Sequence, residues 1–263
     1  MKVSKIMEDL FSLAEKREYS TEGDILKAGD KDREVSKVAV TMFPTVKVIK
    51  EAAEWGAELL ITHEPLYFIG RGQINEEDKV SLLKRKIVEE SGLTIYRFHD
   101  HPHYTTPDII ALGEFKALGL EGELETTDVF DLVRLHLKEP VTALELAKII
   151  EEKLNVKHVR ICGQRDVKSK VLSGVFGAGG AVAFDELKRD ESEIVLVGET
   201  CEWCYAEYAR EAALLGLNKT LMILGHVGSE RDGMVYTAEI LKNMHPELEV
   251  KYFECDEVYT YTD

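Results

Sequence analysis

The sequence predicts an α/β protein built from two similar, interlocked lobes whose sheets are mostly parallel. The first observation behind this prediction is the alternation of strand-type and helix-type segments along most of the 263 residues. The second is a short echo between the halves: "EAAEWGAELLITH" and "EAALLGLNKTLMILGH" both run helix, Gly, apolar strand and His. The third is that polar side chains follow several expected strands, at the sheet edge where α/β proteins bind ligands.

The first lobe is expected over residues 1–121 and starts with an amphipathic helix that places Ile6 and Leu10 on one apolar stripe. Pro44 and Gly56 are typical start and stop signals of the next helix. The apolar run before "THEP" is typical of a strand covered on both faces. After the first helix, the elements are expected in this order: strand 35–40, helix 44–56, strand 58–61, helix 77–91, strand 93–98 and helix 107–118.

Residues 122–140 are expected to form paired strands that cross to the second lobe, residues 141–263. No Pro/Gly/Ser-rich linker separates the lobes, so we expect residues 1–263 to form a single unit. The second lobe is expected to contain the helix 142–155, strands near 158–162, 170–176, 193–197, 219–224 and 249–253, and helices near 181–189, 202–215 and 232–243.

The composition is that of an ordinary globular protein, with 44% hydrophobic and 31% charged residues. The formal net charge of −16 argues against sequence-independent binding to nucleic acid or to an anionic membrane, both of which need Lys/Arg surfaces. The N-terminus mixes Glu with Lys and does not resemble a signal peptide, and no segment is apolar enough to span a bilayer. With four cysteines and no export signal, we expect a cytoplasmic protein without a disulfide framework.

Four stretches place possible metal ligands or proton carriers after expected strands. They are His63-Glu64 in "THEP", His99, Asp100, His101 and His103 in "HDHPH", Glu199, Cys201, Glu202 and Cys204 in "GETCEWC", and His226 and Glu230 in "GHVGSE". Imidazole and carboxylate groups suit Zn, Mn, Fe or Co. If several of these stretches meet in the cleft between the lobes, their side chains could hold two metal ions that activate a bridging water.

Each stretch taken alone also has a simpler explanation. His63 could be a hydrogen-bonded core histidine, and Glu64 a solvated turn residue. "HDHPH" could be a polar surface loop, while His226 and Glu230 could cap a helix that starts after them. Their joint occurrence favours a metal site.

Two further motifs are weaker. Cys201 and Cys204 form a CxxC pair, which can be redox-active or bind zinc, but "CEWCYAEYAREAALL" also reads as an ordinary amphipathic helix. "FGAGGA" at residues 176–181 could cradle a phosphate, although it lacks the Lys-Ser/Thr of a P-loop. Tight packing between a strand and a helix explains this Gly-rich stretch more simply.

Several of these stretches resemble one known family over nearly the whole chain. They are "VAVTMFPTVKVIKEAAEWGAELLITHEPLYF", "IYRFHDHPHYTTPDIIALGEFKALGL", "GVFGAGGA", "VGETCEWC" and "LGHVGSERDGM". They resemble the GTP cyclohydrolase I type 2 homologs, also called the NGG-interacting-factor-three-like family. In that family, two metal ions are held by a His-His pair, by the Asp of an H-x-x-x-D stretch, and by the His and Glu of G-H-x-x-x-E.

The resemblance implies five metal ligands in this chain: His63, Glu64, His103, His226 and Glu230. Glu64 stands where the family has its second His, and His103 stands where it has the Asp. The set still totals three His and two carboxylates, so the two departures together restore the ligand inventory. Thr41 is another departure, because relatives commonly carry an Asp after the "VAV" strand.

The first functional hypothesis is a metal-dependent hydrolase with two divalent ions per chain and a nucleotide-like or phosphoester substrate. Glu199 is a candidate general base or orienting carboxylate, and His99 and His101 are candidates for orienting ligands or substrate. The alternatives are a non-enzymatic metal-binding regulatory or partner-binding protein, and a thiol-redox protein that uses Cys201 and Cys204. The resemblance also implies a homo-oligomer, typically a hexamer.

Overall fold

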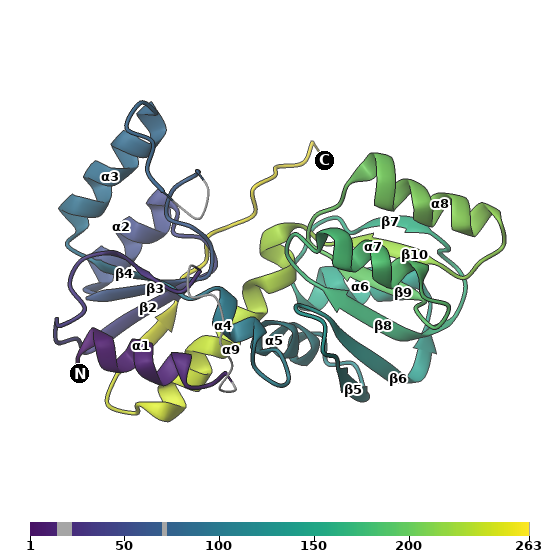
Figure 1. Ribbon diagram of the computed structural model, residues 1–263, viewed down its shortest axis with the longest axis horizontal. Coiled ribbons are helices and arrows are strands. Elements are labelled where there is room, and N and C mark those ends of the chain that lie inside the picture. The colour runs from purple at the N-terminus through teal and green to yellow at the C-terminus, as the bar shows by residue number, and fades with distance from the viewer. Residues whose placement is uncertain (15–22, 70–72, 263) are drawn as a thin grey trace. The chain divides into compact units, whose positions relative to one another are not determined.

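The computed structural model describes residues 1–14, 23–69 and 73–262, and it shows helices around two sheets (Figure 1). The predicted α/β class is confirmed. The chain divides into two compact units. The first unit contains Met1–Thr106 and Met234–Asp256, and the second contains Pro107–Gly233 and Glu257–Asp263.

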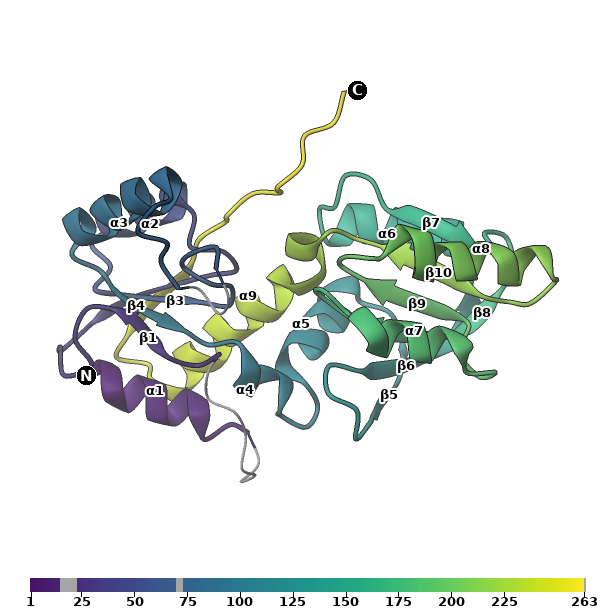
Figure 2. The same ribbon diagram turned by 45° about the horizontal axis from the view of Figure 1, so that its top comes forward.

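The first unit is a five-stranded sheet in the order β1-β4-β3-β2-β11, parallel except at β1. Helices α2 and α3 lie on one side of this sheet and α1 on the other (Figures 1 and 2). The strands are β1 (Leu26–Ala28), β2 (Lys37–Thr41), β3 (Leu59–Thr62), β4 (Thr94–Arg97) and β11 (Glu249–Tyr252). The helices are α1 (Val3–Phe11), α2 (Val46–Trp55), α3 (Lys79–Ser91) and the short α4 (Asp100–His103).

Local signals in the sequence account for much of this unit. All four residues of β3 and of β4 are buried, as expected for strands covered on both faces. Thr45 caps α2 by accepting a hydrogen bond from the Val48 amide, and Gly56 ends the helix in the left-handed region. Ile6 and Leu10 of α1 are buried, as their spacing predicts.

The second unit is a six-stranded mixed sheet in the order β5-β6-β8-β9-β10-β7. Only β8, β9 and β10 run parallel to one another, so the second sheet is less parallel than expected. The strands are β5 (Gly122–Thr126), β6 (Val133–Val141), β7 (Arg160–Gly163), β8 (Ser169–Val175), β9 (Ile194–Val197) and β10 (Thr220–Ile223). The helices are α5 (Ile109–Leu118), α6 (Ala143–Lys153), α7 (Gly180–Lys188), the π-helix η1 (Glu202–Ala206), α8 (Glu207–Leu214) and α9 (His226–Met244).

Two apolar cores cover the faces of the second sheet. Ile194 and Leu196 of β9 belong to the core that includes residues of α5 and α6. Val195 and Val197 of the same strand belong to the core that includes residues of α7 and α8. Alternate residues of a strand point to opposite faces, which is why one continuous apolar strand serves both cores.

The compact units divide the chain differently from the expected lobes 1–121 and 141–263. Residues 122–140 do not cross between the sheets, because β5 and β6 pair with each other inside the second one. Residues 249–252 join the first sheet, because β11 pairs in parallel with β2. Helix α9 starts at His226, six residues earlier than expected, and its residues belong to both units.

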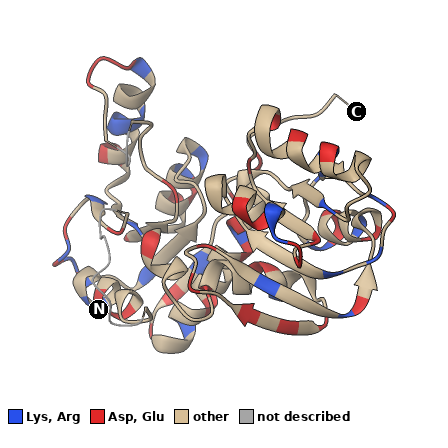
Figure 3. Cartoon of the chain, turned by 45° about the vertical axis from the view of Figure 1, so that its right-hand side comes forward, with Lys and Arg blue, Asp and Glu red and all other residues tan. Residues whose placement is uncertain are grey.

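Charged side chains of both signs are spread over the two units (Figure 3). β5, for example, carries Glu123 and Glu125, and Arg134 of the neighbouring strand forms an ion pair with Glu125. Among the helices in the described part of the chain, none has the length and apolar character needed to cross a bilayer.

Candidate functional site

A histidine cluster, defined here as His63, Glu64, His99 and His103, lies after the carboxyl ends of β3 and β4 in the first unit. His63 directly follows β3, and His103 is the last residue of α4. One ligand atom from each of the three histidines can be chosen so that all three lie within 4.8 Å of one another. The structure therefore brings "THEP" and "HDHPH" together, as their positions after neighbouring parallel strands predict.

His63 is fully buried, and its ring is oriented by the backbone. Its Nδ1 lies 3.2 Å from the carbonyl oxygen of Phe98, so Nδ1 is the nitrogen that donates a proton there. Nε2 is then left as the acceptor nitrogen, and it lies 3.4 Å from Nε2 of His103. Two imidazole nitrogens bound to one tetrahedral metal at about 2.1 Å would be about 3.4 Å apart. This spacing fits a shared metal ion.

His99 belongs to the same cluster. Its ring stacks on that of His63 with the centroids 4.5 Å apart, and its Nδ1 lies 2.8 Å from Oδ1 of Asp100. Burial lowers the pKa of His99, and the nearby His63 and His103 lower it further, whereas Asp100 and Glu64 oppose this change. The neutral imidazole that results is the form that binds metals. The sequence predicted only an orienting role for His99, since the family pattern uses the residue four positions later.

Glu64 is 7% exposed and lies between a histidine and a guanidinium. Its Oε1 is 3.8 Å from Nε2 of His99, and its Oε2 is 3.9 Å from a terminal nitrogen of Arg97. Nε of Arg97 also donates to the carbonyl oxygen of His63 at 3.1 Å. Arg97 therefore compensates the charge of the buried carboxylate and holds the turn that carries it.

His101 points to a different partner. Its Nδ1 lies 2.7 Å from Oδ2 of Asp24, and its ring lies 3.6 Å from that of Phe11 between centroids. Asp24 also accepts hydrogen bonds from the backbone amides of His99 and His101, at 2.8 and 3.2 Å. Asp24 thus fixes the segment that carries His99. The sequence analysis missed it, because the contacts span more than seventy residues and no local motif marks them.

The second unit contains its own group, defined here as the His226 group: Glu199, His226 and Glu230. His226 is the first residue of α9, and Glu230 follows four residues later on the same helix face. Nε2 of His226 lies 3.1 Å from Oε2 of Glu230, and Nδ1 lies 2.7 Å from Oε1 of Glu199. The alternative in which His226 and Glu230 precede and cap the helix is wrong, because both lie within α9.

The Gly-rich stretch packs on the His226 group. Gly177 has φ +60°, and a Cβ at this position would lie 2.5 Å from Oε1 of Glu230. Its amide donates to Oγ of Ser229 at 3.0 Å, and its carbonyl accepts from the amide of Glu199 at 2.8 Å. Gly177 is therefore needed for close approach to the carboxylate, which agrees with the tight-packing explanation of "FGAGGA".

The remaining sequence candidates have other surroundings. Cys201 directly precedes η1, Cys204 lies in it, and both are half-buried free thiols. Neither belongs to any group of possible metal ligands found in the described ranges. Thr41 is fully buried, and its hydroxyl donates to the carbonyl oxygen of Phe253 at 2.9 Å, so it links the ends of β2 and β11.

Comparisons with known proteins agree with this architecture. The chain is 27% identical to a "GTP cyclohydrolase 1 type 2 homolog" of Clostridium perfringens, covering 91% of this chain and 90% of that one. Among solved structures, Staphylococcus aureus hypothetical protein SA1388 has a TM-score of 0.75 at 19% identity, with 99% of each chain covered. A Bacillus cereus protein related to NIF3 also has a TM-score of 0.75, at 15% identity and with 100% of each chain covered.

The family profile described as Duf34/NIF3 (NGG1p interacting factor 3) matches residues 1–258, which is nearly the whole chain. Together with the full-length relatives, this match confirms the resemblance carried by the sequence motifs. The chain belongs to the Duf34/NIF3 family.

Proposed function

We propose that this protein binds two divalent metal ions and uses them to hydrolyse a small nucleotide-like or phosphoester substrate. The proposed ligands are those of the family pattern: His63, Glu64, His103, His226 and Glu230. The observation that carries the proposal is the pair of Nε2 atoms of the buried His63 and His103, 3.4 Å apart in a cluster of three histidines.

The donor chemistry fits first-row divalent metals. Imidazole nitrogen and carboxylate oxygen suit Zn, Mn, Fe and Co, whereas a softer ion would need sulfur ligands. His63 has its second ring nitrogen fixed by a backbone carbonyl, and His226 has its second ring nitrogen fixed by Glu199. Ligand histidines in metalloproteins are held in this way.

A divalent metal bound by these residues would lower the pKa of a coordinated water and so supply a nucleophile near neutral pH. Two side chains of the second unit, Glu199 and His226, would support this chemistry. Glu199 accepts the Nδ1 proton of His226, which fixes the ring and makes Nε2 the ligand atom. The Glu199 side chain is 61% exposed, so it can also reach solvent, and it is our candidate for accepting the proton of the attacking water.

The proposed substrate is a nucleotide or another phosphoester. The relatives are named GTP cyclohydrolase 1 type 2 homologs, and this supports a nucleotide among the candidate substrates. A shared fold does not fix a substrate, so phosphoesters stay in the proposal. The homo-oligomer implied by the family resemblance also stays a prediction, which sedimentation of the full chain would test.

The experiment that tests the proposal is metal analysis, element by element, of wild type, His103→Ala and His136→Ala. His136 is the matched control, because it is an exposed histidine that pairs with Glu125. We expect about two ions per chain in wild type and in the control, and fewer in His103→Ala. The metal-loaded wild type should then hydrolyse members of a phosphoester and nucleotide panel.

Absence of stoichiometric metal after reconstitution would contradict the whole proposal. Full metal content without turnover on the panel would contradict only the hydrolase part, and it would favour a metal-binding regulatory protein. Equal metal in wild type and His103→Ala would remove His103 from the ligand set.

A further inference from the structure

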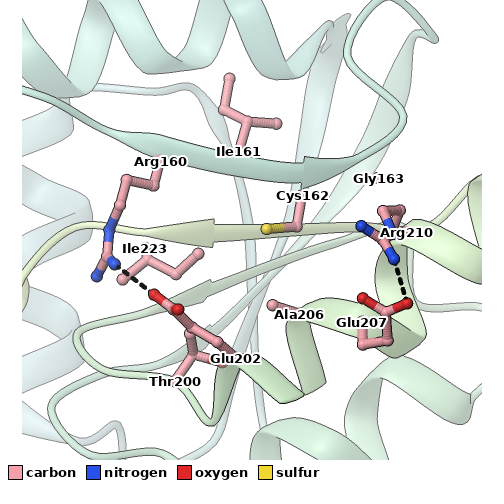
Figure 4. A pocket seen from close by; sticks show the side chains of 10 residues that line it. All are labelled: Arg160, Ile161, Cys162, Gly163, Thr200, Glu202, Ala206, Glu207, Arg210 and Ile223. Atoms are coloured by element: carbon pink, nitrogen blue, oxygen red, sulfur yellow. Dashed lines mark hydrogen bonds and ion pairs between the residues drawn. The ribbon is translucent and has the colours of Figure 1, made fainter. Parts of the chain in front are cut away.

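A cavity of about 340 Å³ lies in the second unit, between β7 and the end of β10 on one side and η1 and α8 on the other (Figure 4). Its inner wall is made by the thiol of Cys162 and the apolar side chains of Ala206 and Ile223. The volume is within the range of small-molecule sites. None of the residues assigned to the proposed metal site lines this cavity.

An arginine stands at each end of the cavity. Arg160 pairs with Glu202 at 3.2 Å on one side of Cys162, and Arg210 pairs with Glu207 on the other (Figure 4). Both ion pairs are largely exposed to solvent. Exposed pairs contribute about 0–1 kcal/mol, so a carboxylate from outside can replace either Glu at small cost.

Two further observations mark the cavity as a binding site. Thr200 lines it, and Oγ1 of this residue is buried and has no hydrogen-bond partner within residues 1–14, 23–69 and 73–262. A buried hydroxyl without a partner is costly unless a ligand or water satisfies it. The helix that closes the cavity starts as the π-helix η1, and such segments occur frequently at functional sites.

We propose that this cavity binds a small organic acid, with its apolar body against Cys162, Ala206 and Ile223 and its carboxylate on the guanidinium of Arg160 or Arg210. In this arrangement, Glu202 or Glu207 turns out to solvent when the ligand's carboxylate takes its place. The Thr200 hydroxyl satisfies a second polar atom of the ligand.

We favour an acid over an amine as the ligand because the guanidinium groups that line the cavity are more weakly hydrated than its carboxylates. A guanidinium is planar and weakly hydrated, so it can bind a carboxylate through two hydrogen bonds beside an apolar surface. The carboxylates of Glu202 and Glu207 are strongly hydrated at the rim, where an ammonium ligand would gain little over water.

The test uses Cys162 as a reporter inside the cavity. The full chain is alkylated with iodoacetamide at about pH 9, because burial raises the pKa of the Cys162 thiol. Peptide mass spectrometry then follows each cysteine separately, with and without benzoate as the probe. We expect saturating benzoate to slow alkylation of Cys162 by at least about fivefold and to leave Cys255, a buried thiol of the first unit, unchanged.

One neutral probe, one positively charged probe and two variants test whether the carboxylate of the ligand is what the cavity recognises. Benzamide and benzylamine should protect Cys162 far less than benzoate. The double variant Arg160→Gln/Arg210→Gln should lose the protection, whereas Arg165→Gln should keep it, because Arg165 is an exposed arginine outside the cavity. Unchanged alkylation of Cys255 shows that the first unit of each variant is folded, and urea denaturation of each variant checks the second unit, which carries the substitutions.

Several outcomes would overturn the assignment. Equal protection by benzamide would mean that the cavity binds the ring through its apolar wall alone. Stronger protection by benzylamine would mean that the cavity binds an ammonium group through Glu202 and Glu207 instead of a carboxylate. Protection that survives the double variant, or no protection by benzoate up to about 10 mM, would remove the acid site altogether.

Discussion

The histidine cluster of the first unit and the His226 group of the second contain the same kinds of donor in opposite surroundings. In the first, all members except the half-buried His99 are buried, and Glu64 faces a buried guanidinium. The second is partly open, and its orienting carboxylate, Glu199, stands mostly in water. A buried donor set is rigid and costly to disturb, whereas an open one is easily solvated when a partner is removed. The comparison predicts that losing the charge partner of Glu64 in the first group mainly lowers folding stability, whereas losing the orienting carboxylate of the second group mainly lowers metal affinity.

The largest effect is expected from Arg97→Met. It leaves the Glu64 carboxylate without its buried guanidinium and removes the hydrogen bond to the His63 carbonyl. We expect a loss of about 3 kcal/mol in the free energy of unfolding, measured by urea denaturation. Adding Glu64→Gln to this variant should restore part of that loss, because no uncompensated charge then remains. An Arg97→Met protein as stable as wild type would show that Glu64 is not held as a buried charge.

The next effect concerns the glycine beneath the His226 group. Gly177→Ala introduces a Cβ that would lie 2.5 Å from Oε1 of Glu230, at a positive φ. We expect about 2 kcal/mol of destabilisation together with weaker metal binding. Gly180→Ala is the matched control: Gly180 also has a positive φ, but a Cβ there meets nothing within 4 Å. Calorimetric unfolding and zinc titration of both variants separate backbone strain from the displacement of Glu230.

Glu199→Gln should sharpen the contrast with Arg97→Met. The exposed carboxylate contributes little to folding, so the free energy of unfolding should change by less than about 0.5 kcal/mol. Metal affinity should fall by about 10- to 100-fold, since His226 loses the charge that orients it and raises its basicity. Competition titration with a chelator measures this change. A large loss of stability with unchanged metal affinity would reverse the roles assigned to the two groups.

The smallest expected effect is on the pH dependence of folding stability, to which the two units contribute with opposite sign. In the first unit, burial lowers the pKa of Lys84 to about 8, so the unfolded chain binds more protons between about pH 8 and 10.5 and stability rises with pH there. In the second unit, burial raises the pKa of Glu114 well above its usual value, so stability falls as pH rises above about 4.5. We expect Lys84→Met to stabilise the protein by about 1 kcal/mol at pH 7 and not at pH 10.5. Urea denaturation from about pH 4.5 to 10.5 checks both slopes, because Lys84→Met should remove the rise above about pH 8 and Glu114→Gln should remove the fall above about pH 4.5.

The sequence predicted what local patterns encode. Apolar runs identified β3, β4, β9 and β10, and the polar residues just after them include His63 and His226. What it could not predict depends on long-range contacts. The positions of Asp24 and Arg97 beside the histidine cluster have no local signal. The helical start at His226 was missed because "GHVGSE" contains a glycine and several polar residues, which locally suggest a loop or a cap.

The late strand β11 has a consequence for how the protein is made. The first unit needs residues 234–256 to complete its sheet, yet the whole continuous part of the second unit is translated before them. During synthesis, the second sheet can therefore close while the β2 edge of the first sheet still lacks its neighbour. An open strand edge of this kind can pair with another chain. The nascent protein therefore carries a risk of misassembly at β2 until residues 249–252 have been translated.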